Sequence, residues 1–206
     1  LTGPKGQSSV TGRFFSAGYI LGSAGVELQF EEWGRDRRVF YTSDTNMQAQ
    51  TIIPGGEYPD STDVLILEST QGAEPEAAAT SRPEERDRFR KTLSQVLARG
   101  GTALIPVFVM GRAQEILVLL GQLKREGAIP ADVPIYTAGS MRAIAGVYDD
   151  TRNTTPRVDA SDEVYAVDQE LVPYESEAKR EILEGPGIMV VSSGMMIEPT
   201  LSNVLA

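Results

Sequence analysis

Hydrophobic and polar positions alternate in short segments over the first fifth of the chain. Residues 26–30 (VELQF) alternate apolar and polar side chains, and residues 39–42 (VFYT) are mostly β-branched or aromatic. A turn through Gly34 separates the two segments, a spacing typical of antiparallel strands with one exposed face. The pattern therefore predicts a meander of exposed or half-buried strands over residues 13–42.

The next segments change from a polar loop to a continuous apolar run. Residues 45–63 are polar and carry prolines and glycines, so we expect a loop with at most one short helix. Residues 63–69 (DVLILES) form an unbroken apolar run of the kind found in buried, often parallel, strands. We therefore predict a buried strand there.

A connector over residues 73–83 leads into a predicted helix over residues 82–99. Ser81 is a plausible N-cap, and Glu84 stands three residues later at the spacing of a capping box. An apolar stripe faces one side, and Gly100 ends the helix. The stripe consists of Phe89, Leu93, Val96 and Leu97. The helix mixes arginines with acidic residues, which we interpret as a solvated face with charge pairs.

Three strand-to-turn-to-helix units follow. Residues 102–111 lead into 112–127, residues 133–139 lead into 140–148, and residues 187–194 lead toward the end of the chain. Alternating buried strands and amphipathic helices predict an α/β fold with a parallel, doubly wound sheet, whose ligands bind at the carboxyl ends of the strands.

Those predicted strand ends are residues 108–111, 137–140 and 192–194. In the second and third, Ser and Gly precede a possible helix start, where backbone N–H groups and the helix dipole favour an anion such as phosphate. The alternative is that small residues merely make tight turns there.

Composition limits the class of protein. The 206 residues are 41% hydrophobic, enough for one domain or two closely packed lobes. No apolar run approaches the ~20 residues that span a bilayer, and the start, LTGPKGQSSV, lacks the features of a signal peptide. The chain has no cysteine, which fits a reducing compartment. We therefore expect a cytoplasmic protein that does not enter membranes.

The charge and the missing residue types restrict the chemistry further. The chain has no histidine, which removes the ordinary zinc sites and histidine-dependent triads. Carboxylates remain for magnesium, calcium or manganese, but they show no EF-hand spacing. The formal net charge of −10 argues against strong autonomous binding of nucleic acid, although a local basic patch remains open.

Several blocks of sequence carry a family resemblance. They occur in the order AGYILGSA, VELQF, VFYTSD, DVLILESTQG, GGTALIPVFVMGRAQEIL and GPGIMVVSSGMM. In this order they resemble the β-CASP group of the metallo-β-lactamase superfamily, which contains an RNA 3′-end cleavage endonuclease, its inactive partner subunit and prokaryotic RNA nucleases. The resemblance implies that residues 1–74 form part of a metallo-β-lactamase-like αββα sandwich lobe and 75–197 most of a β-CASP lobe. Residues 198–206 would then begin a further element.

The resemblance also implies roles for individual residues. Tyr19 stands where active members carry a zinc-binding histidine, Asp44 matches a bridging carboxylate ligand, and Glu68 matches a carboxylate that orients a later histidine. Ser43 replaces the usual glycine, and the family's remaining histidines are expected before Leu1 and after Ala206. Active members use zinc. We expect none here, because Asp44 alone is a vestigial ligand and a catalytic zinc needs about three protein ligands.

Each of these residues has a structural interpretation as well. On this interpretation, Tyr19 packs in a filled cavity and its hydroxyl bonds to Asp44 or Glu68. Asp44 would then serve only as a turn residue. Arg112 and Glu115 make structural contacts at the start of a helix.

The functional predictions follow from these points. We predict a pseudoenzyme that acts as an RNA-processing scaffold or as partner to an active relative. The alternatives are an incomplete or divergent piece of a zinc-dependent RNA hydrolase, and a module that binds anions or nucleotides. The predicted partners are RNA, bound weakly where the lobes meet, and a protein partner or second copy of the chain. The residues predicted to bind RNA phosphate are Ser192, Ser193, Gly194, Arg112 and Arg142. Met195 and Met196 are predicted separately, as core or hinge residues.

Overall fold

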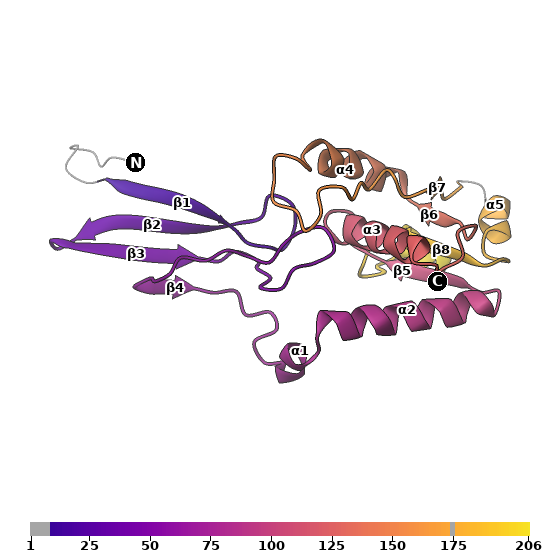
Figure 1. Ribbon diagram of the computed structural model, residues 1–206, viewed down its shortest axis with the longest axis horizontal. Helices are drawn as coiled ribbons and strands as arrows, with labels where there is room; N and C mark the ends of the chain where they lie inside the picture. The colour runs from indigo at the N-terminus through magenta and orange to yellow at the C-terminus, as the bar shows by residue number, and fades with distance from the viewer. Residues whose placement is uncertain (1–8, 174–175) are drawn as a thin grey trace. The chain divides into compact units, whose positions relative to one another are not determined.

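The computed structural model describes residues 9–173 and 176–206, and it divides into two compact units, Leu1–Glu74 and Pro75–Ala206 (Figure 1). Most of the segment used to predict the absence of a signal peptide lies outside the described residues. The first unit contains β1 (Val10–Ser16), β2 (Ala24–Glu32), β3 (Arg35–Tyr41) and β4 (Val64–Ile66). The second contains α1 (Pro75–Ala79), α2 (Arg82–Ala98), β5 (Thr102–Pro106), α3 (Arg112–Arg125), β6 (Ile135–Thr137), α4 (Gly139–Asp150), β7 (Glu170–Leu171), α5 (Ser176–Glu181), β8 (Gly187–Val191) and α6 (Leu201–Leu205).

The first unit is a four-stranded sheet in the order β1-β2-β3-β4. The first three strands form the predicted antiparallel meander, and β4 pairs with β3 in parallel. The turn between β2 and β3 consists of Trp33 and Gly34, with φ of 53° and 75°. Two successive positive φ values are typical of the tight hairpin turns that match the twist of paired strands.

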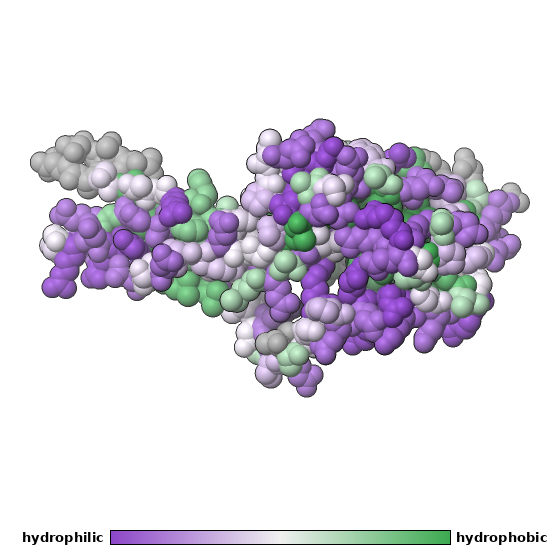
Figure 2. Space-filling view, viewed as in Figure 1, coloured by the Kyte–Doolittle hydropathy of each residue, from purple (hydrophilic) through white to green (hydrophobic). Residues whose placement is uncertain are grey.

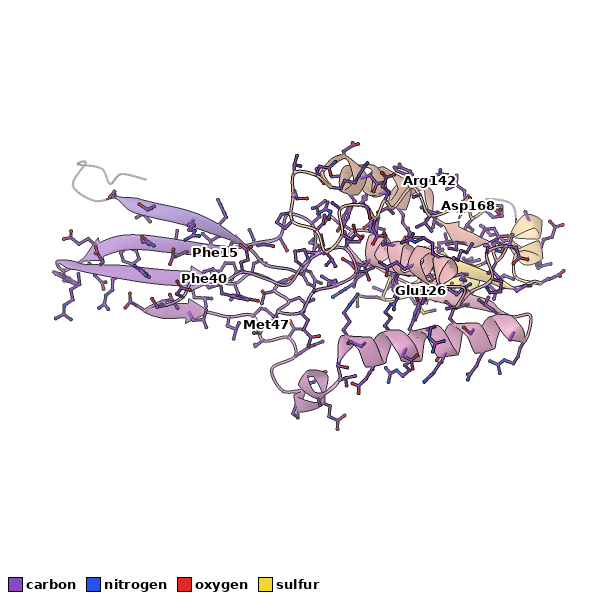
Figure 3. The ribbon with its side chains drawn as sticks, viewed as in Figure 1. Phe15, Phe40, Met47, Glu126, Arg142 and Asp168 are labelled. Atoms are coloured by element: carbon purple, nitrogen blue, oxygen red, sulfur yellow. The ribbon has the colours of Figure 1, made fainter. Side chains whose placement is uncertain are left out.

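One face of this sheet carries an aromatic cluster. Phe15 and Phe40 come from neighbouring parts of this sheet (Figure 3). Their rings meet edge to face with centroids 5.6 Å apart, and the ring of Tyr58 meets that of Phe40 in the same way at 6.2 Å. Phe15 and Phe40 are buried, and Ile52 and Ile53 of the following loop are buried too. Since a buried aromatic ring contributes a large apolar area, this cluster is the main core of the first unit.

The prediction of a buried strand over residues 63–69 is wrong in its burial. The strand exists, and it is parallel to its neighbour, but Val64, Leu65, Ile66 and Leu67 are each at least half exposed. Figure 2 shows hydrophobic residues on the surface over β4. The physical reason is position: β4 is an edge strand, and burial of an edge strand depends on what covers it.

The second unit is built on a parallel sheet in the order β5-β8-β6-β7 (Figure 1). All its pairs are parallel, which confirms the predicted α/β class and the parallel order of the strands near 102, 135 and 188. The sequence pattern did not predict β7 or α5. It also treated residues 73–83 as a connector, where the structure has the short helix α1.

The central strand β8 organises the core of the second unit. Ile188, Met189, Val190 and Val191 have no exposed surface. Because successive strand residues point to opposite faces, both faces of the sheet are covered here. Met189 and Val191 belong to a cluster that also receives Leu201 and Leu205 of α6, so the chain end packs on this sheet.

Helix α2 begins at its predicted cap. The Glu84 carboxylate accepts hydrogen bonds from the backbone N–H and the hydroxyl of Ser81, at 3.0 and 2.7 Å. Leu93 and Leu97 are buried on the apolar stripe, and Asp87 pairs with Arg90 and Lys91 on the outer face. The solvated-face interpretation is therefore confirmed.

Among the described residues, no helix has the length and apolar character needed to cross a membrane.

Candidate functional site

Three loops at one end of the first unit's sheet hold Tyr19, Asp44 and Glu68. The carbonyl of Ala17 accepts hydrogen bonds from Asn46 N–H and from the Thr45 hydroxyl, both at 2.9 Å. These bonds tie the Tyr19 loop to the Asp44 loop. The backbone N–H of Glu68 donates to the Thr42 hydroxyl at 3.3 Å, which attaches the third loop.

The loop around Tyr19 requires its glycine. Gly18 has a φ of 68°, and a Cβ there would lie 2.3 Å from the backbone nitrogen of Gly56. Glycine adopts this conformation without strain, and a residue with a Cβ would collide at this approach. Buried Gln50 then donates from its side-chain amide to the carbonyls of Gly18 and Tyr19, which holds the loop in place. Gln50 was not singled out from the sequence, because nothing local marks it.

The three predicted residues have different surroundings. Tyr19 is half-buried, and its backbone N–H donates to the Ser23 hydroxyl at 3.3 Å. Asp44 is exposed and follows Ser43, whose φ of 57° lies in the left-handed region. The family that the sequence resembles usually has glycine at the position of Ser43. Glu68 accepts from the backbone N–H of Thr70 at 2.9 Å. The roles assigned to these three side chains stay predictions.

The residues here do not fit a zinc ion. Zinc is held by about three protein ligands in catalytic sites and four in structural ones, drawn from His, Cys, Asp and Glu. The chain has neither histidine nor cysteine, and within the described ranges no group of three or more such ligands is placed to hold a metal.

A second candidate site lies at the carboxyl edge of the parallel sheet, in the second unit. Val107 N–H donates to the Val191 carbonyl at 2.9 Å, so the ends of β5 and β8 lie side by side. A Cβ on Gly194 would lie 3.1 Å from the backbone nitrogen of Phe108. The loops that follow these two strands are thus in direct backbone contact, and Gly194 permits it.

The loop at residues 192–194 differs from the prediction in one respect. It does not open a helix directly: turns follow it, and α6 begins only at Leu201, after Pro199, which disfavours a helical conformation in the residue before it. The carbonyls of Ser192 and Ser193 instead accept from Ser202, through its N–H at 2.9 Å and its hydroxyl at 2.7 Å. These bonds fix the loop's backbone.

Two hydroxyls at this edge have no hydrogen-bond partner among the described residues. They are Oγ of Ser193, after β8, and Oγ1 of Thr137, at the end of β6. The two strands are neighbours, with Thr137 opposite Val190. An unsatisfied buried hydroxyl is costly, and in native proteins it often marks a place where water or a ligand binds.

The helix predicted after the second strand end is present. Helix α4 starts immediately after β6, its N-cap is Ala138, and no side chain caps it. Gly139 and Ser140 of its first turn are exposed, as is Arg142 one turn along (Figure 3). An open helix start with an arginine beside it favours anions.

Helix α3 begins differently, because its own side chain caps it. The Gln114 amide oxygen accepts from Gly111 N–H at 2.8 Å, and its nitrogen donates to the Val109 carbonyl at 3.1 Å. Gln114 is fully buried. The Gly111 N–H is therefore already satisfied, and the Ala113 N–H donates to the Phe108 carbonyl at 3.2 Å, so neither group is available to an anion. Sequence reasoning missed this role of Gln114, although the capping spacing was available.

Arginines gather around one buried acid near the start of α3. Glu115 is only 5% exposed, and Arg112 is exposed three residues before it. Burial lowers the pKa of the Arg82 guanidinium; nearby Arg112 and Arg86 lower this pKa further, whereas Glu115 raises it. The three arginines outnumber the one acid, so this group is positive in a chain of net charge −10. The structural role of Arg112 and Glu115 stays a prediction.

Apolar side chains also stand on these loops. Phe108, Met110, Met195 and Ile197 are each more than half exposed. Met195 is therefore not a core residue, because the loop turns it to solvent, and Met196 beside it has a φ of 51° and is half-buried. The hinge role suggested as the alternative for both residues stays a prediction.

The comparisons with known proteins agree on one family. A β-CASP domain model matches residues 113–206. An RNase J-like protein of Methanocaldococcus jannaschii is 38% identical over 137 residues, which cover 66% of this chain and 31% of the relative. Cleavage and polyadenylation specificity factor subunit 3 of Dictyostelium discoideum is 36% identical over 136 residues, 65% of this chain and 17% of that protein.

The chain belongs to the β-CASP group of the metallo-β-lactamase superfamily.

A third relative of this β-CASP protein extends the match toward the first unit. Transcription termination factor FttA of Methanothermobacter thermautotrophicus is 32% identical over 193 residues, 88% of this chain and 29% of that factor. The chain spans less than a third of the length of these curated relatives. The β-CASP model covers α3 from its second residue onward and all of β6, α4 and β8, whereas β5 lies before the matched residues.

Proposed function

We propose that this β-CASP protein contacts RNA in RNA processing, and that these 206 residues do not hydrolyse RNA by themselves. In this role the chain is a scaffold or a partner of an active nuclease. RNA phosphate binds at the carboxyl edge of the parallel sheet, where Ser192, Ser193, Gly194 and Arg142 stand, with Arg112 beside it.

The observation that carries the proposal is the open start of α4 beside two unsatisfied hydroxyls. Backbone N–H groups at Gly139 and Ser140 bind an anion without any net positive charge, so the chain's acidity does not forbid the contact. Thr137 precedes them directly, and Ser193 follows the neighbouring strand. The names of the relatives, which are RNases and RNA-processing factors, support RNA as the source of the phosphate.

The proposed lack of hydrolysis rests on the ligand set. A metal-bound water would be the nucleophile of a metallohydrolase, and its activation needs the metal. This chain supplies Asp44 without the histidines that would share a metal with it. Binding without chemistry is what the remaining side chains support.

Titration of labelled single-stranded RNA at low and at high salt tests the proposal. We expect weak binding that falls as salt rises, because few phosphates are contacted. Arg142→Ala should reduce the salt slope by about one unit. Arg88→Ala is the matched control, since Arg88 is an exposed arginine on α2 paired with Glu85. Absence of binding by the unaltered chain at low salt refutes the proposed contact.

A second candidate function is a contribution to a zinc-dependent RNA hydrolase that needs further segments. The retained loops favour it: a hydrogen bond ties the Asp44 loop to the Tyr19 loop, and another attaches Glu68 to Thr42, at the start of the Asp44 loop. Stoichiometric zinc in the purified protein, together with RNA cleavage, would support this candidate over the scaffold.

The cytoplasm is the proposed compartment, since the chain has no cysteine to suggest an oxidising one.

A further inference from the structure

One buried serine of α6 holds the loop at residues 192–194. The side-chain hydroxyl of Ser202 donates to the carbonyl oxygen of Ser193 at 2.7 Å, and its backbone N–H donates to the carbonyl oxygen of Ser192 at 2.9 Å. Ser202 itself is fully buried. It therefore acts on any ligand of this loop only through the backbone that it holds.

The direction of these hydrogen bonds follows from the single proton of a serine hydroxyl. Ser202 gives that proton to the Ser193 carbonyl, so in its other contact, with the Thr200 hydroxyl at 3.2 Å, Thr200 is the donor. Thr200 stands at the start of α6, but its side chain does not cap that helix. The two hydroxyls thus form a short chain of hydrogen bonds that ends on the carbonyl of Ser193.

The base of this chain is fixed to the parallel sheet. Leu201 and Leu205, the first and last residues of α6, pack against the buried cluster that contains Met189 and Val191 of β8. The loop also begins directly after β8, so Ser202 ties its far side to the sheet from which it starts. The other bond to the Ser193 carbonyl comes from Met196 N–H at 3.1 Å, and it only closes the turn on itself.

The bond from Ser202 sets the direction of one backbone donor. The peptide bond between Ser193 and Gly194 is trans, so the N–H of Gly194 points opposite to the carbonyl of Ser193. Because that carbonyl points toward α6, the N–H points away from α6. A backbone N–H with a fixed direction binds an anion without needing a positive charge.

We propose that Ser202 is a positioning residue for the RNA contact: by holding the Ser193 carbonyl, it keeps the Gly194 N–H directed at the bound phosphate. This inference rests on the proposed function and adds to it a residue that the RNA does not touch. Without the Ser202 hydroxyl, the loop must be ordered when the phosphate binds, and that ordering lowers the affinity.

Titration of labelled single-stranded RNA into the full chain and into Ser202→Ala at low salt tests the proposal. We expect the dissociation constant to rise about tenfold in the variant, a loss comparable to one hydrogen bond to a charged group. The salt dependence should not change, since no basic residue is removed. The number of binding sites per chain should stay the same as well. A variant that is merely partly unfolded would lose sites and keep its dissociation constant.

Ser94→Ala is the matched control. The Ser94 hydroxyl on α2 donates to the carbonyl of Ala128 at 2.9 Å, so this variant loses the same kind of hydrogen bond in the same unit. Ala128 follows the last turn of α3, whereas the carboxyl edge lies at the first turn of that helix. Ser94→Ala should therefore bind RNA as the unaltered chain does.

Thr200→Ala is a second, milder variant. It removes the donor to the Ser202 hydroxyl and leaves the bond from Ser202 to Ser193 in place. We expect the dissociation constant to rise by about two- to threefold, because hydrogen bonds in a chain strengthen one another. If Ser202→Ala does not fold, this variant decides the test, and an unchanged dissociation constant overturns the proposal.

Amide NMR of the same samples reports on the donor itself. The Gly194 amide proton should move downfield when RNA is added to the unaltered chain and to Ser94→Ala, because hydrogen bonds to an ionised acceptor are short. In Ser202→Ala the shift should be smaller.

The outcomes separate the two proposals. A chain that binds no RNA refutes the proposed function, and the role of Ser202 with it. If the chain binds RNA and Ser202→Ala binds it equally well, only the role of Ser202 is refuted. A loss of binding sites at an unchanged dissociation constant, or equal losses of affinity in Ser202→Ala and Ser94→Ala, would also overturn that role.

Discussion

The side-chain amide of Gln50 donates a hydrogen bond to the carbonyl oxygen of Tyr19 at 2.7 Å, and a second to that of Gly18 at 2.8 Å. Because Gln50 is buried, Gln50→Leu leaves both carbonyls without this donor. We expect the free energy of unfolding to fall by about 2–3 kcal/mol. Urea denaturation measures the loss. Gln48→Leu, at an exposed position of the same loop, is the control, and equal losses in both variants would contradict the role of Gln50.

Gly18→Ala and Gly22→Ala form a matched pair. Both glycines have positive φ, of 68° and 80°, but a Cβ on Gly18 collides with the Gly56 backbone, whereas a Cβ on Gly22 meets nothing within 4 Å. Gly22→Ala should cost about 1 kcal/mol from the backbone conformation alone. Gly18→Ala should cost clearly more, because the loops must also move apart. Thermal unfolding of the two variants checks the order, and equal losses would show that the loop contact is unimportant.

Replacing Glu84 should have a pH-dependent effect. Hydrogen bonds from the Ser81 side chain and backbone hold the pKa of Glu84 below its ordinary value of 4.5. A carboxyl whose pKa is lower in the folded state stabilises it above the unfolded pKa, and this stabilisation is lost as pH falls through the folded value. Glu84→Gln should therefore be less stable than the unaltered chain at neutral pH, with the difference shrinking below about 4.5. Melting temperatures over a pH series show whether the gap closes.

Zinc titration should give no saturable binding at Asp44. The chain lacks the nitrogen and sulfur ligands that accompany a carboxylate in a zinc site. Isothermal calorimetry of the chain and of Asp44→Ala should give the same featureless trace. A one- or two-site isotherm that disappears in Asp44→Ala would contradict this expectation and would favour the hydrolase candidate.

Two threonines should respond in opposite ways to replacement by valine. The Thr137 hydroxyl is buried without a partner among the described residues, so Thr137→Val should be neutral or stabilising by up to about 1 kcal/mol. The Thr42 hydroxyl donates to the Ser43 carbonyl and accepts from Glu68 N–H, so Thr42→Val should destabilise. Chemical denaturation of both variants checks the contrast. A large loss in Thr137→Val would show that its hydroxyl has a partner in solution.

The candidate sites could be predicted only in part. Strand ends in a parallel sheet meet at one edge whatever the side chains are, so the pattern placed the ends of β6 and β8 correctly just before residues 138–140 and 192–194. It did not reveal that Ser202 fixes the second of these loops, nor that Gln114 caps α3. Both roles depend on where a side chain reaches in space, and local sequence carries little of that information.

The amino-acid sequence by itself determined the local elements of this protein. Three kinds of signal act within a few residues: the period of apolar positions, the cap at Ser81 and Glu84, and the turn at Gly34. The sequence alone therefore predicted β2, β3, α2 and the parallel α/β units.

Tertiary structure decided what each apolar surface meets. The apolar run at Val64–Leu67 has the same sequence pattern as the fully buried strand β8. However, β4 is the exposed edge of its sheet, whereas β8 lies inside its sheet. An apolar run states only that burial is favourable; the neighbouring strands and layers determine whether burial occurs, because the hydrophobic effect is non-directional and specifies no partner.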